Sequence, residues 1–346
     1  MQTRKRLDEV FDKAFPVPFD DSSKFVFFGD VHRGDDSLSD EFGRNRHIYY
    51  HALNYYYNND FTYVEVGDGD ELWEHPNFEH IRSAHISVFE ILKKFHKSNR
   101  MHILFGNHNM HLRYPSYVKR HYYYTYDEYL DKQQDLFPDL NVHEALILTH
   151  RETCQEIFVV HGHQGDLLND HLWRLSYFLI RYVWKVLHVI GVKYAASPAK
   201  NRFKRHRIEK NYNKWNEQHD IMIICGHTHR PKFPAEGEPA YFNTGCCIHP
   251  RGITCLEMMY GKIMLVTWNM HSKRDGTVYI KRTLTHGPTP IKEFQKAPAS
   301  CDIKERSNRS LFKHFKKFKA EKPKSKDFNL DQDQEQDDIA SSDKDE

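Results

Sequence analysis

The sequence lacks the features that mark a secreted or disulfide-stabilised chain. Its start, Met1 to Arg6, is basic, but residues 7–19 are interrupted by charges and prolines and hold no apolar core of a signal peptide. The six cysteines include no CxxC pair. In a chain of 346 residues this favours reduced thiols over a disulfide framework. We therefore expect a cytoplasmic protein.

The chain also lacks internal repeats and a strong overall charge. Its formal net charge is only +2, but that average hides local segregation. Residues 304–326 are basic and residues 327–346 are acidic, and the core-forming pattern ends near residue 297. We expect residues 297–346 to be a disordered, charge-segregated tail. Residues 1–296 are expected to form one domain.

Five short apolar runs predict buried strands. Each ends at a glycine, cysteine or histidine that precedes a polar loop, and the runs are residues 24–29, 62–67, 101–106, 156–161 and 220–225. Helical patterns over about 41–58 and 78–97 separate the first three. Strands that alternate with helices indicate crossover connections and a largely parallel sheet. Ligands gather at the carboxyl ends of such strands.

The pattern of apolar residues changes after Pro234. Short strand-like runs joined by tight turns occupy residues 241–246, 253–258, 262–268 and 277–280. We expect them to form a second sheet packed on the first. The sequence thus predicts an α/β fold, a two-sheet β-sandwich flanked by helices.

Five polar blocks stand at the ends of the five apolar runs. Every block combines glycine with carboxylate, amide or imidazole, the groups that bind divalent transition metals. The blocks are Gly29-Asp30-Val31-His32, Gly67-Asp68, Gly106-Asn107-His108-Asn109, His161-Gly162-His163 and Gly226-His227-Thr228-His229. Core packing gives no reason to repeat glycine before such side chains, so the blocks predict a metal site.

The residue types suit two neighbouring ions. Asp30 and His32 are spaced by two, so on an extended segment both can point to one side. The carboxylate of Asp68 has two oxygens and can bridge two ions. Asn107 offers an amide oxygen. Nitrogen donors come from His161, His227 and His229.

These blocks, in this order over about residues 24–232, resemble the pattern of the calcineurin-like metallophosphoesterases. The resemblance implies that Asp30, His32, Asp68 and His229 hold one ion. It implies that Asp68, Asn107, His161 and His227 hold the other, with Asp68 as the bridge. His108 would be the acid beside the ions. The implied fold is the metallophosphoesterase-type sandwich, with a helical insertion at about 167–217 before the last metal motif.

The implied reaction is hydrolysis of a phosphomonoester, phosphodiester or pyrophosphate by metal-bound hydroxide. Two ions about 3.5–4 Å apart can clamp the attacking and leaving oxygens of an in-line displacement. A mixed nitrogen and oxygen donor set favours manganese, with iron, zinc, cobalt or nickel as alternatives. The partner is a phosphorylated substrate whose class the blocks do not specify.

Several positions leave alternatives open. Asn109 stands where the family has an acid that orients the histidine, which predicts weaker general-acid catalysis by His108. His163 could replace His161 as a ligand. Asp70 and Glu71 are expected to orient the ligands or face solvent. Arg33 could contact phosphate or be solvated.

The stretch 171–191 is rich in apolar residues at helical spacing, with a narrow basic stripe. Its permanent charges argue against a membrane span. It could be a buried helix with a basic edge, or a lid that meets an apolar substrate or lipid at the membrane periphery. The basic run 199–215 could be a solvated helix or attract anionic groups. Nucleic-acid binding is not favoured, because no recognisable module is present.

An insertion at this place, together with Asp68-Gly-Asp-Glu-Leu-Trp73, is similar to the UDP-2,3-diacylglucosamine pyrophosphatases. That branch has arginine where this chain has His108, so its substrate does not transfer directly. The rivals are a protein serine/threonine phosphatase and, outside enzymes, a catalytically idle binding scaffold.

Overall fold

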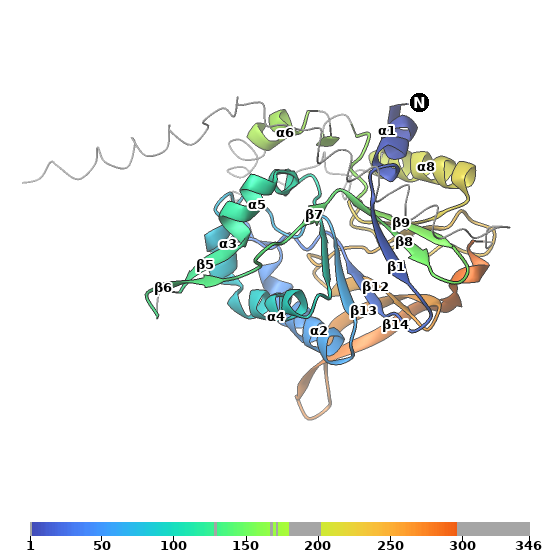
Figure 1. Ribbon diagram of the computed structural model, residues 1–346. Helices are drawn as coiled ribbons and strands as arrows, with labels where there is room; N and C mark the ends of the chain where they lie inside the picture. The colour runs from blue at the N-terminus through green and yellow to red at the C-terminus, as the bar shows by residue number, and fades with distance from the viewer. Residues whose placement is uncertain (1, 128–129, 167–168, 171, 180–201, 296–346) are drawn as a thin grey trace, which may run out of the picture.

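The computed structural model describes residues 2–127, 130–166, 169–170, 172–179 and 202–295. Within these residues two β-sheets face each other, and helices cover the outer side of each sheet (Figure 1). The α/β class and the two-sheet architecture predicted from the sequence are therefore confirmed.

The larger sheet has seven strands in the order β14-β13-β12-β2-β3-β4-β7. Strands β2 (Phe25–Phe28), β3 (Thr62–Val66), β4 (Met101–Leu104) and β7 (Val142–His143) run parallel. Helix α2 (Arg46–Asn58) connects β2 to β3. Helices α3 (Phe78–Ala84) and α4 (Ile86–Lys97) connect β3 to β4. This half of the sheet is the predicted set of crossover units.

The smaller sheet has five strands in the order β1-β8-β9-β10-β11. They are β1 (Phe15–Phe19), β8 (Ala145–His150), β9 (Glu156–Val160), β10 (Met222–Cys225) and β11 (Tyr241–Asn243). Strand β1, Phe-Pro-Val-Pro-Phe, lies at the edge of this sheet. An edge position suits its two prolines, because proline has no amide hydrogen to donate to a neighbouring strand.

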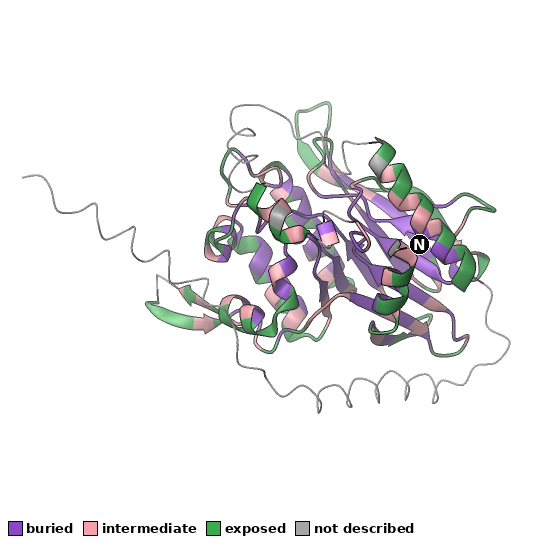
Figure 2. Cartoon of the chain, turned by 90° about the horizontal axis from the view of Figure 1, so that it is seen from above, coloured by how far each residue is buried: buried purple, intermediate pink, exposed green. Residues whose placement is uncertain are grey.

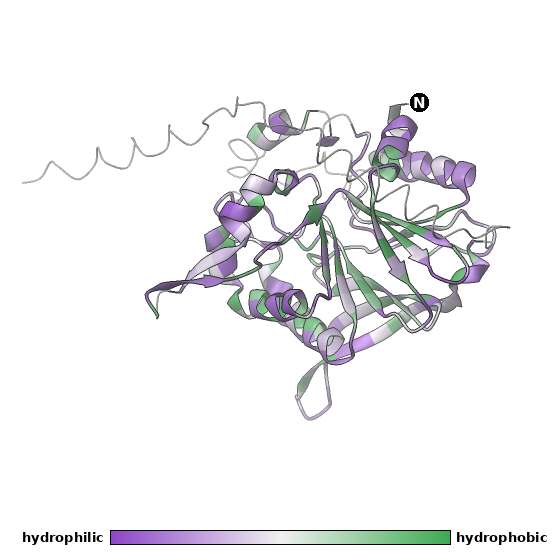
Figure 3. Cartoon of the chain, in the orientation of Figure 1, coloured by the Kyte–Doolittle hydropathy of each residue, from purple (hydrophilic) through white to green (hydrophobic). Residues whose placement is uncertain are grey.

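Three apolar clusters hold the layers together. One lies between the two sheets and includes Phe27, Val64 and Ile224. A second joins the larger sheet to α2 and α4, and a third joins the smaller sheet to α1 (Gln2–Phe11) and α8 (Arg202–His219). Figure 2 shows buried residues along both sheets and exposed residues on the outer helix faces. Figure 3 shows many hydrophobic residues on the strands and many hydrophilic residues on the outer helices.

The assignment of strands to sheets differs from the sequence prediction. Strands β12 (Ile253–Met259), β13 (Lys262–Ser272) and β14 (Val278–Pro290) do not form a separate sheet, because β12 pairs antiparallel with β2 and extends the larger sheet. Conversely, β9 and β10 belong to the smaller sheet, not to the sheet of β2. Periodicity identifies strands, but it carries no information on which strands pair.

The remaining elements lie at the periphery. A short hairpin of β5 (Tyr124–Asp127) and β6 (Lys132–Asp135) follows α5 (Pro115–Tyr122). The 3-10 turns are Gly43–Asn45, Met110–Arg113 and Ile291–Glu293. Of the predicted insertion, α6 (Trp173–Leu179) and α8 are helical. Most of 171–191 and the tail 297–346 lie outside the described residues.

Four cysteines, Cys225, Cys246, Cys247 and Cys255, are buried free thiols, as predicted. Cys154 is disulfide-bonded, so the expectation of reduced thiols is wrong at that position. No helix among the described residues combines the length and the apolar character needed to cross a bilayer.

Candidate metal centre

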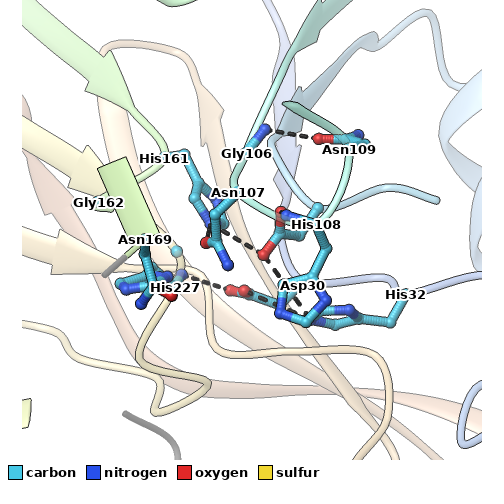
Figure 4. Close-up of polar contacts among 12 residues, drawn as sticks. Asp30, His32, Gly106, Asn107, His108, Asn109, His161, Gly162, Asn169 and His227 are labelled. Carbon is cyan, nitrogen blue, oxygen red and sulfur yellow. Dashed lines mark hydrogen bonds and ion pairs between the residues drawn. The ribbon is translucent and has the colours of Figure 1, made fainter. Parts of the chain in front are cut away.

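The five polar blocks meet at one end of the sandwich, although their strands belong to two sheets. The first three follow β2, β3 and β4 of the larger sheet, and the last two follow β9 and β10 of the smaller sheet. Figure 4 shows Asp30, Asn107, His161 and His227 directed toward a common centre. The site therefore lies between the ends of the two sheets.

Asp30, His32 and His229 form the first group of metal-capable side chains. The Nε2 atom of His229 lies 3.2 Å from Asp30 Oδ1, and the Nε2 atom of His32 lies 3.8 Å from the same oxygen. The two Nε2 atoms are 3.2 Å apart. The geometry brings one carboxylate and two imidazoles to a single point.

Asp68, His161 and His227 form the second group, and all three are buried. His161 Nε2 lies 3.0 Å from Asp68 Oδ2 and 3.3 Å from Asn107 Oδ1. Asp68 Oδ2 also lies 4.0 Å from His32 Nε2 in the first group. Asp68 thus stands between the two groups, the place that the resemblance gives to a bridging ligand.

Hydrogen bonds to the main chain orient these ligand candidates. The amide of His227 donates to Asp30 Oδ2 over 2.7 Å, and the amide of His108 donates to Asp68 Oδ1 over 2.8 Å. His161 Nδ1 lies 2.8 Å from the carbonyl oxygen of Val66 and donates to it. This bond leaves Nε2 of His161 as the atom that faces the centre.

The backbone at the ligand positions is left-handed. Asp30, His32, Asp68, His227 and His229 have φ between 50° and 65°. Asp30 and His32 therefore do not sit on an extended segment, as predicted from their spacing, yet both side chains still reach the same group. Positive φ is uncommon outside glycine, and Asp and His tolerate it better than bulkier residues. Such strain tends to gather at functional sites.

Two glycines of the blocks lie so close to neighbouring side chains that a Cβ atom would not fit. A Cβ on Gly67, where φ is +79°, would lie 2.4 Å from His161 Nδ1. A Cβ on Gly106 would lie 2.2 Å from Asp68 Oδ1. Any larger residue would displace a ligand candidate that comes from a different block. The recurring glycine therefore reflects the close approach of the five loops.

His108 lies beside both groups and is held by three neighbours. Its Nδ1 lies 2.8 Å and 2.7 Å from the two carboxylate oxygens of Glu71. Its ring stacks on Trp73 and meets His32 edge to face. Burial alone would lower the pKa of His108, but the carboxylates of Glu71 and Asp68 raise that pKa to about 9. The ring therefore carries a proton that it can donate near neutral pH.

Asn109 is not the partner of His108. Its Oδ1 accepts a hydrogen bond of 2.6 Å from the amide of Gly106, and the side chain points away from the centre (Figure 4). The expectation that Asn109 leaves His108 without an orienting acid is therefore wrong. Glu71, 37 positions earlier, supplies this carboxylate; it was expected to orient the ligands or face solvent, and its contact with His108 was not predicted.

Arg33 is neither solvated nor directed at a phosphate. It is buried and donates to both oxygens of Glu65, over 2.8 Å and 3.1 Å, and to Asp70 over 2.7 Å. Tyr63 and Tyr122 complete the network by donating to Glu65 and Asp70. Arg33 thus ties the Asp30–His32 loop to the Asp68–Glu71 loop. Both alternatives considered for Arg33 were wrong.

His163 is fully buried and belongs to none of the metal-capable groups among the described residues, whereas His161 belongs to one. Two further polar residues of the same loop, which sequence reasoning missed, lie beside His227. Asp166 Oδ2 is 3.9 Å from His227 Nε2 and accepts a hydrogen bond of 2.8 Å from Asn169. Their position in the loop that begins at His161 was the signal in the sequence that they could lie near the site.

The donor set fits two divalent cations. His32 donates from Nδ1 to Glu71 Oε2 over 2.7 Å, so the lone pair on its Nε2 faces the centre. Asp30 Oδ1 is buried and lies 3.2 Å from His229 Nε2 and 3.8 Å from His32 Nε2, so it faces the same point. Burial would raise the pKa of Asp68, but His161 and His108 hold it well below its usual value. Converging bare nitrogens and ionised oxygens are the environment that a transition metal needs.

Comparison with known proteins gives little beyond the architecture. No protein-family model and no curated protein sequence matches this chain. Solved structures that resemble it include vacuolar protein sorting 29 from Cryptosporidium parvum, with 12% identity and a TM-score of 0.33 over 78% of this chain and 100% of that chain. A cold-active protein-tyrosine phosphatase of a psychrophilic Shewanella species has 13% identity and a TM-score of 0.33 over 79% and 84%.

A third such structure is a 5'-nucleotidase from Staphylococcus aureus, in complex with α-ketoglutarate. It has 11% identity and a TM-score of 0.31 over 84% of this chain and 58% of that chain. At these TM-scores the resemblance carries no argument about function. The functional conclusion must therefore come from the site.

Proposed function

We propose that this protein is a phosphoesterase that depends on two divalent metal ions and hydrolyses a phosphomonoester, a phosphodiester or a pyrophosphate. One observation carries the proposal. The carboxylate of Asp68 lies between two groups of mixed nitrogen and oxygen donors, 3.0 Å from His161 and 4.0 Å from His32. A shared carboxylate between two such groups is the arrangement that places two ions next to each other.

The residues divide into two metal sites. Asp30, His32, Asp68 and His229 would hold one ion, and Asp68, Asn107, His161 and His227 would hold the other. When bound, the two ions supply an activated water and the positive charge that binds a phosphate group. The two carboxylates of Asp30 and Asp68 neutralise only part of that charge, which leaves the site attractive to an anion.

His108 would protonate the oxygen of the leaving group. Its Nδ1 is engaged by Glu71, so Nε2 is the atom free to act, and its side chain is 22% exposed beside an otherwise buried site. The carboxylates of Glu71 and Asp68 raise the pKa of the ring to about 9, which favours its protonated form. A positioned acid of this kind contributes about 10²- to 10⁴-fold to the rate.

Manganese is the first metal to test. The mixed donor set also accepts iron, zinc, cobalt and nickel, which are the alternatives. Metal analysis of the purified protein should find about two ions per chain. Manganese-dependent hydrolysis of simple aryl mono- and diesters should follow. A protein that binds no metal and hydrolyses none of these substrates would be the binding scaffold instead.

The substrate class is the open part of the proposal. A panel of phosphopeptide, cyclic nucleotide, UDP-linked lipid and aryl esters separates the alternatives. The narrower alternative, a pyrophosphatase acting on a lipid-linked nucleotide, depends on the 171–191 stretch. Within the described part of that stretch, Phe178 and Leu179 are 55% and 42% exposed. Turnover of the UDP-linked lipid alone would favour it.

A location in the cytoplasm with contact to the membrane periphery is part of the same proposal. Liposome flotation of the wild-type protein against a Trp173→Ala, Trp184→Ala double variant tests it. Trp184 itself lies outside the described residues. Equal flotation of both proteins would remove the lipid alternative and leave a soluble phosphorylated substrate.

A further inference from the structure

One carboxylate touches two imidazole rings that have different tasks. Glu71 Oε2 lies 2.7 Å from Nδ1 of His32, and the same carboxylate lies 2.7–2.8 Å from Nδ1 of His108. The side chain of Glu71 is only 12% exposed. Glu71 is thus the acceptor that both rings share.

For His32, this contact determines which nitrogen faces the metal centre. A hydrogen bond from Nδ1 to a carboxylate fixes the tautomer and leaves Nε2 without a proton. It also makes the ring a stronger ligand. His32 Nε2 is the atom that lies near Asp30, Asp68 and His229.

For His108, the contact determines the direction of the other ring nitrogen. Nδ1 is bound to Glu71, and the ring is fixed between Trp73 and His32, with centroid distances of 4.4 Å and 4.7 Å. Only Nε2 remains to reach a substrate. Asn109 cannot provide this constraint, because its oxygen is bound to Gly106.

His32, Glu71 and His108 also form a third group of side chains that could bind a metal ion. A metal there would have to take Nδ1 of both rings, and each ring would lose the proton that it shares with Glu71. His32 could not then be fixed as a ligand of the first group through that bond. The hydrogen-bonded arrangement is the one compatible with two ions.

We propose that Glu71 is a positioning residue that couples metal binding to proton transfer, by orienting His32 as a ligand and His108 as the acid. The proposal rests on the proposed phosphoesterase function. In the family that the chain resembles, an acid at position 109 would orient the histidine. Here Glu71 orients His108 instead, and it also orients His32. Loss of this one carboxylate therefore impairs two separable properties.

The test compares Glu71→Gln and Glu71→Asp with a matched control, Glu74→Gln. The control removes a carboxylate three positions further along the same loop. Glu74 also acts electrostatically on His108 but belongs to none of the metal-capable groups, so this variant is a control for metal affinity alone. Metal affinity is measured by isothermal titration with manganese alone. We expect Glu71→Gln to weaken binding by about 10- to 100-fold, the effect usual for loss of a carboxylate behind a histidine ligand. Glu71→Asp should restore part of the affinity, and Glu74→Gln should bind as the wild type does.

Proton transfer is measured separately, at saturating manganese, from how kcat/KM changes with the leaving group of the ester. A phenyl ester needs protonation of its leaving oxygen far more than a p-nitrophenyl ester does. Glu71→Gln should lower kcat/KM for the phenyl ester by about 10²-fold or more, and for the p-nitrophenyl ester by less than about 10-fold. In a His108→Ala background, Glu71→Gln should add no further loss that depends on the leaving group.

The outcomes separate the two proposals. If the wild-type protein binds manganese but cleaves no ester, the phosphoesterase proposal fails, and the affinity measurement alone still decides the role at His32. If the wild type is active and Glu71→Gln lowers both esters equally with unchanged metal affinity, the positioning role is overturned. Three bound ions in the wild type and two in Glu71→Gln would overturn it in favour of a third metal site.

Discussion

The indole ring of Trp73 stacks on the imidazole of His108, with ring centroids 4.4 Å apart and ring planes at 27°. Trp73 is only 1% exposed, so it forms a rigid wall against which the histidine is placed. Trp73→Phe should keep a ring in this position and change turnover little. Trp73→Ala should lower kcat for a phenyl ester by about 10-fold or more.

Loss of the buried ring should also destabilise the fold by ~3–5 kcal/mol, the usual cost of truncating a buried tryptophan to alanine. Urea denaturation measures this cost. Steady-state kinetics with phenyl and p-nitrophenyl esters measures the effect on proton transfer. Equal activity of the alanine variant and the wild type on both esters would show that the stacking has no functional role.

Asn109→Asp should not improve the enzyme. The carboxylate of Glu71 already holds Nδ1 of His108, and the side chain at position 109 is turned to the amide of Gly106. The variant keeps that hydrogen bond but adds a buried negative charge. We expect a lower melting temperature and a change in kcat of less than about 3-fold. A gain confined to esters with poor leaving groups would mean that Asn109 does reach His108.

The sequence was sufficient to predict which residues gather at the candidate site but not the identity of every neighbour. The five blocks and their strands follow from local patterns, since an apolar run and the polar residues after it are adjacent in the chain. The convergence of Asp30, Asp68, Asn107 and the histidines follows from the general rule for strand ends. The bond between Glu71 and His108 joins loops that follow different strands, and no local pattern encodes it.

Arg33 and the strands after Pro234 illustrate the same limit. An arginine after a metal-site histidine suggests solvent or phosphate, because arginine is mostly exposed. Its burial depends on Glu65 and Asp70, which come from another strand and another loop. Likewise β12 has the alternation of a strand, but its pairing with β2 depends on a register over more than 200 residues.

Arg33→Lys should destabilise the protein strongly. Lysine lacks the forked geometry that lets arginine bind Glu65 and Asp70 together, so one buried carboxylate loses its partner. Breaking a buried pair of this kind costs ~3–5 kcal/mol. Urea denaturation should show this loss, whereas Arg46→Lys, in a half-exposed pair with Asp36, should change stability little. Similar stabilities for the two variants would contradict the proposed link between the loops.

Asp40 should stabilise the loop after the first block in a pH-dependent way. Burial would raise the pKa of Asp40, but hydrogen bonds from His85 and from the amides of Asp36 and Gly43 lower it. A carboxyl whose pKa is lower in the folded state contributes stability above its unfolded pKa near ~4. That contribution is lost as the pH falls through the folded pKa.

Asp40→Asn should therefore cost about 2 kcal/mol at pH 7, the scale of hydrogen bonds to a charged group. The difference from the wild type should shrink as the pH falls below ~4. Urea denaturation from pH 7 to pH 3 gives the comparison, with the exposed Asp60→Asn as control. A difference that stays constant over this range would mean that the charge of Asp40 is not the source of its effect.

The proposed site depends on the sharing of Asp68 by two metal ions, and the metal content of an Asp68 variant reports on that sharing. Wild-type protein and Asp68→Asn are loaded with manganese, freed of unbound metal by gel filtration and analysed by mass spectrometry of the metal. We predict about two ions per chain in the wild type, and at most one in Asp68→Asn together with loss of ester hydrolysis. Two ions and full activity in Asp68→Asn would contradict the account.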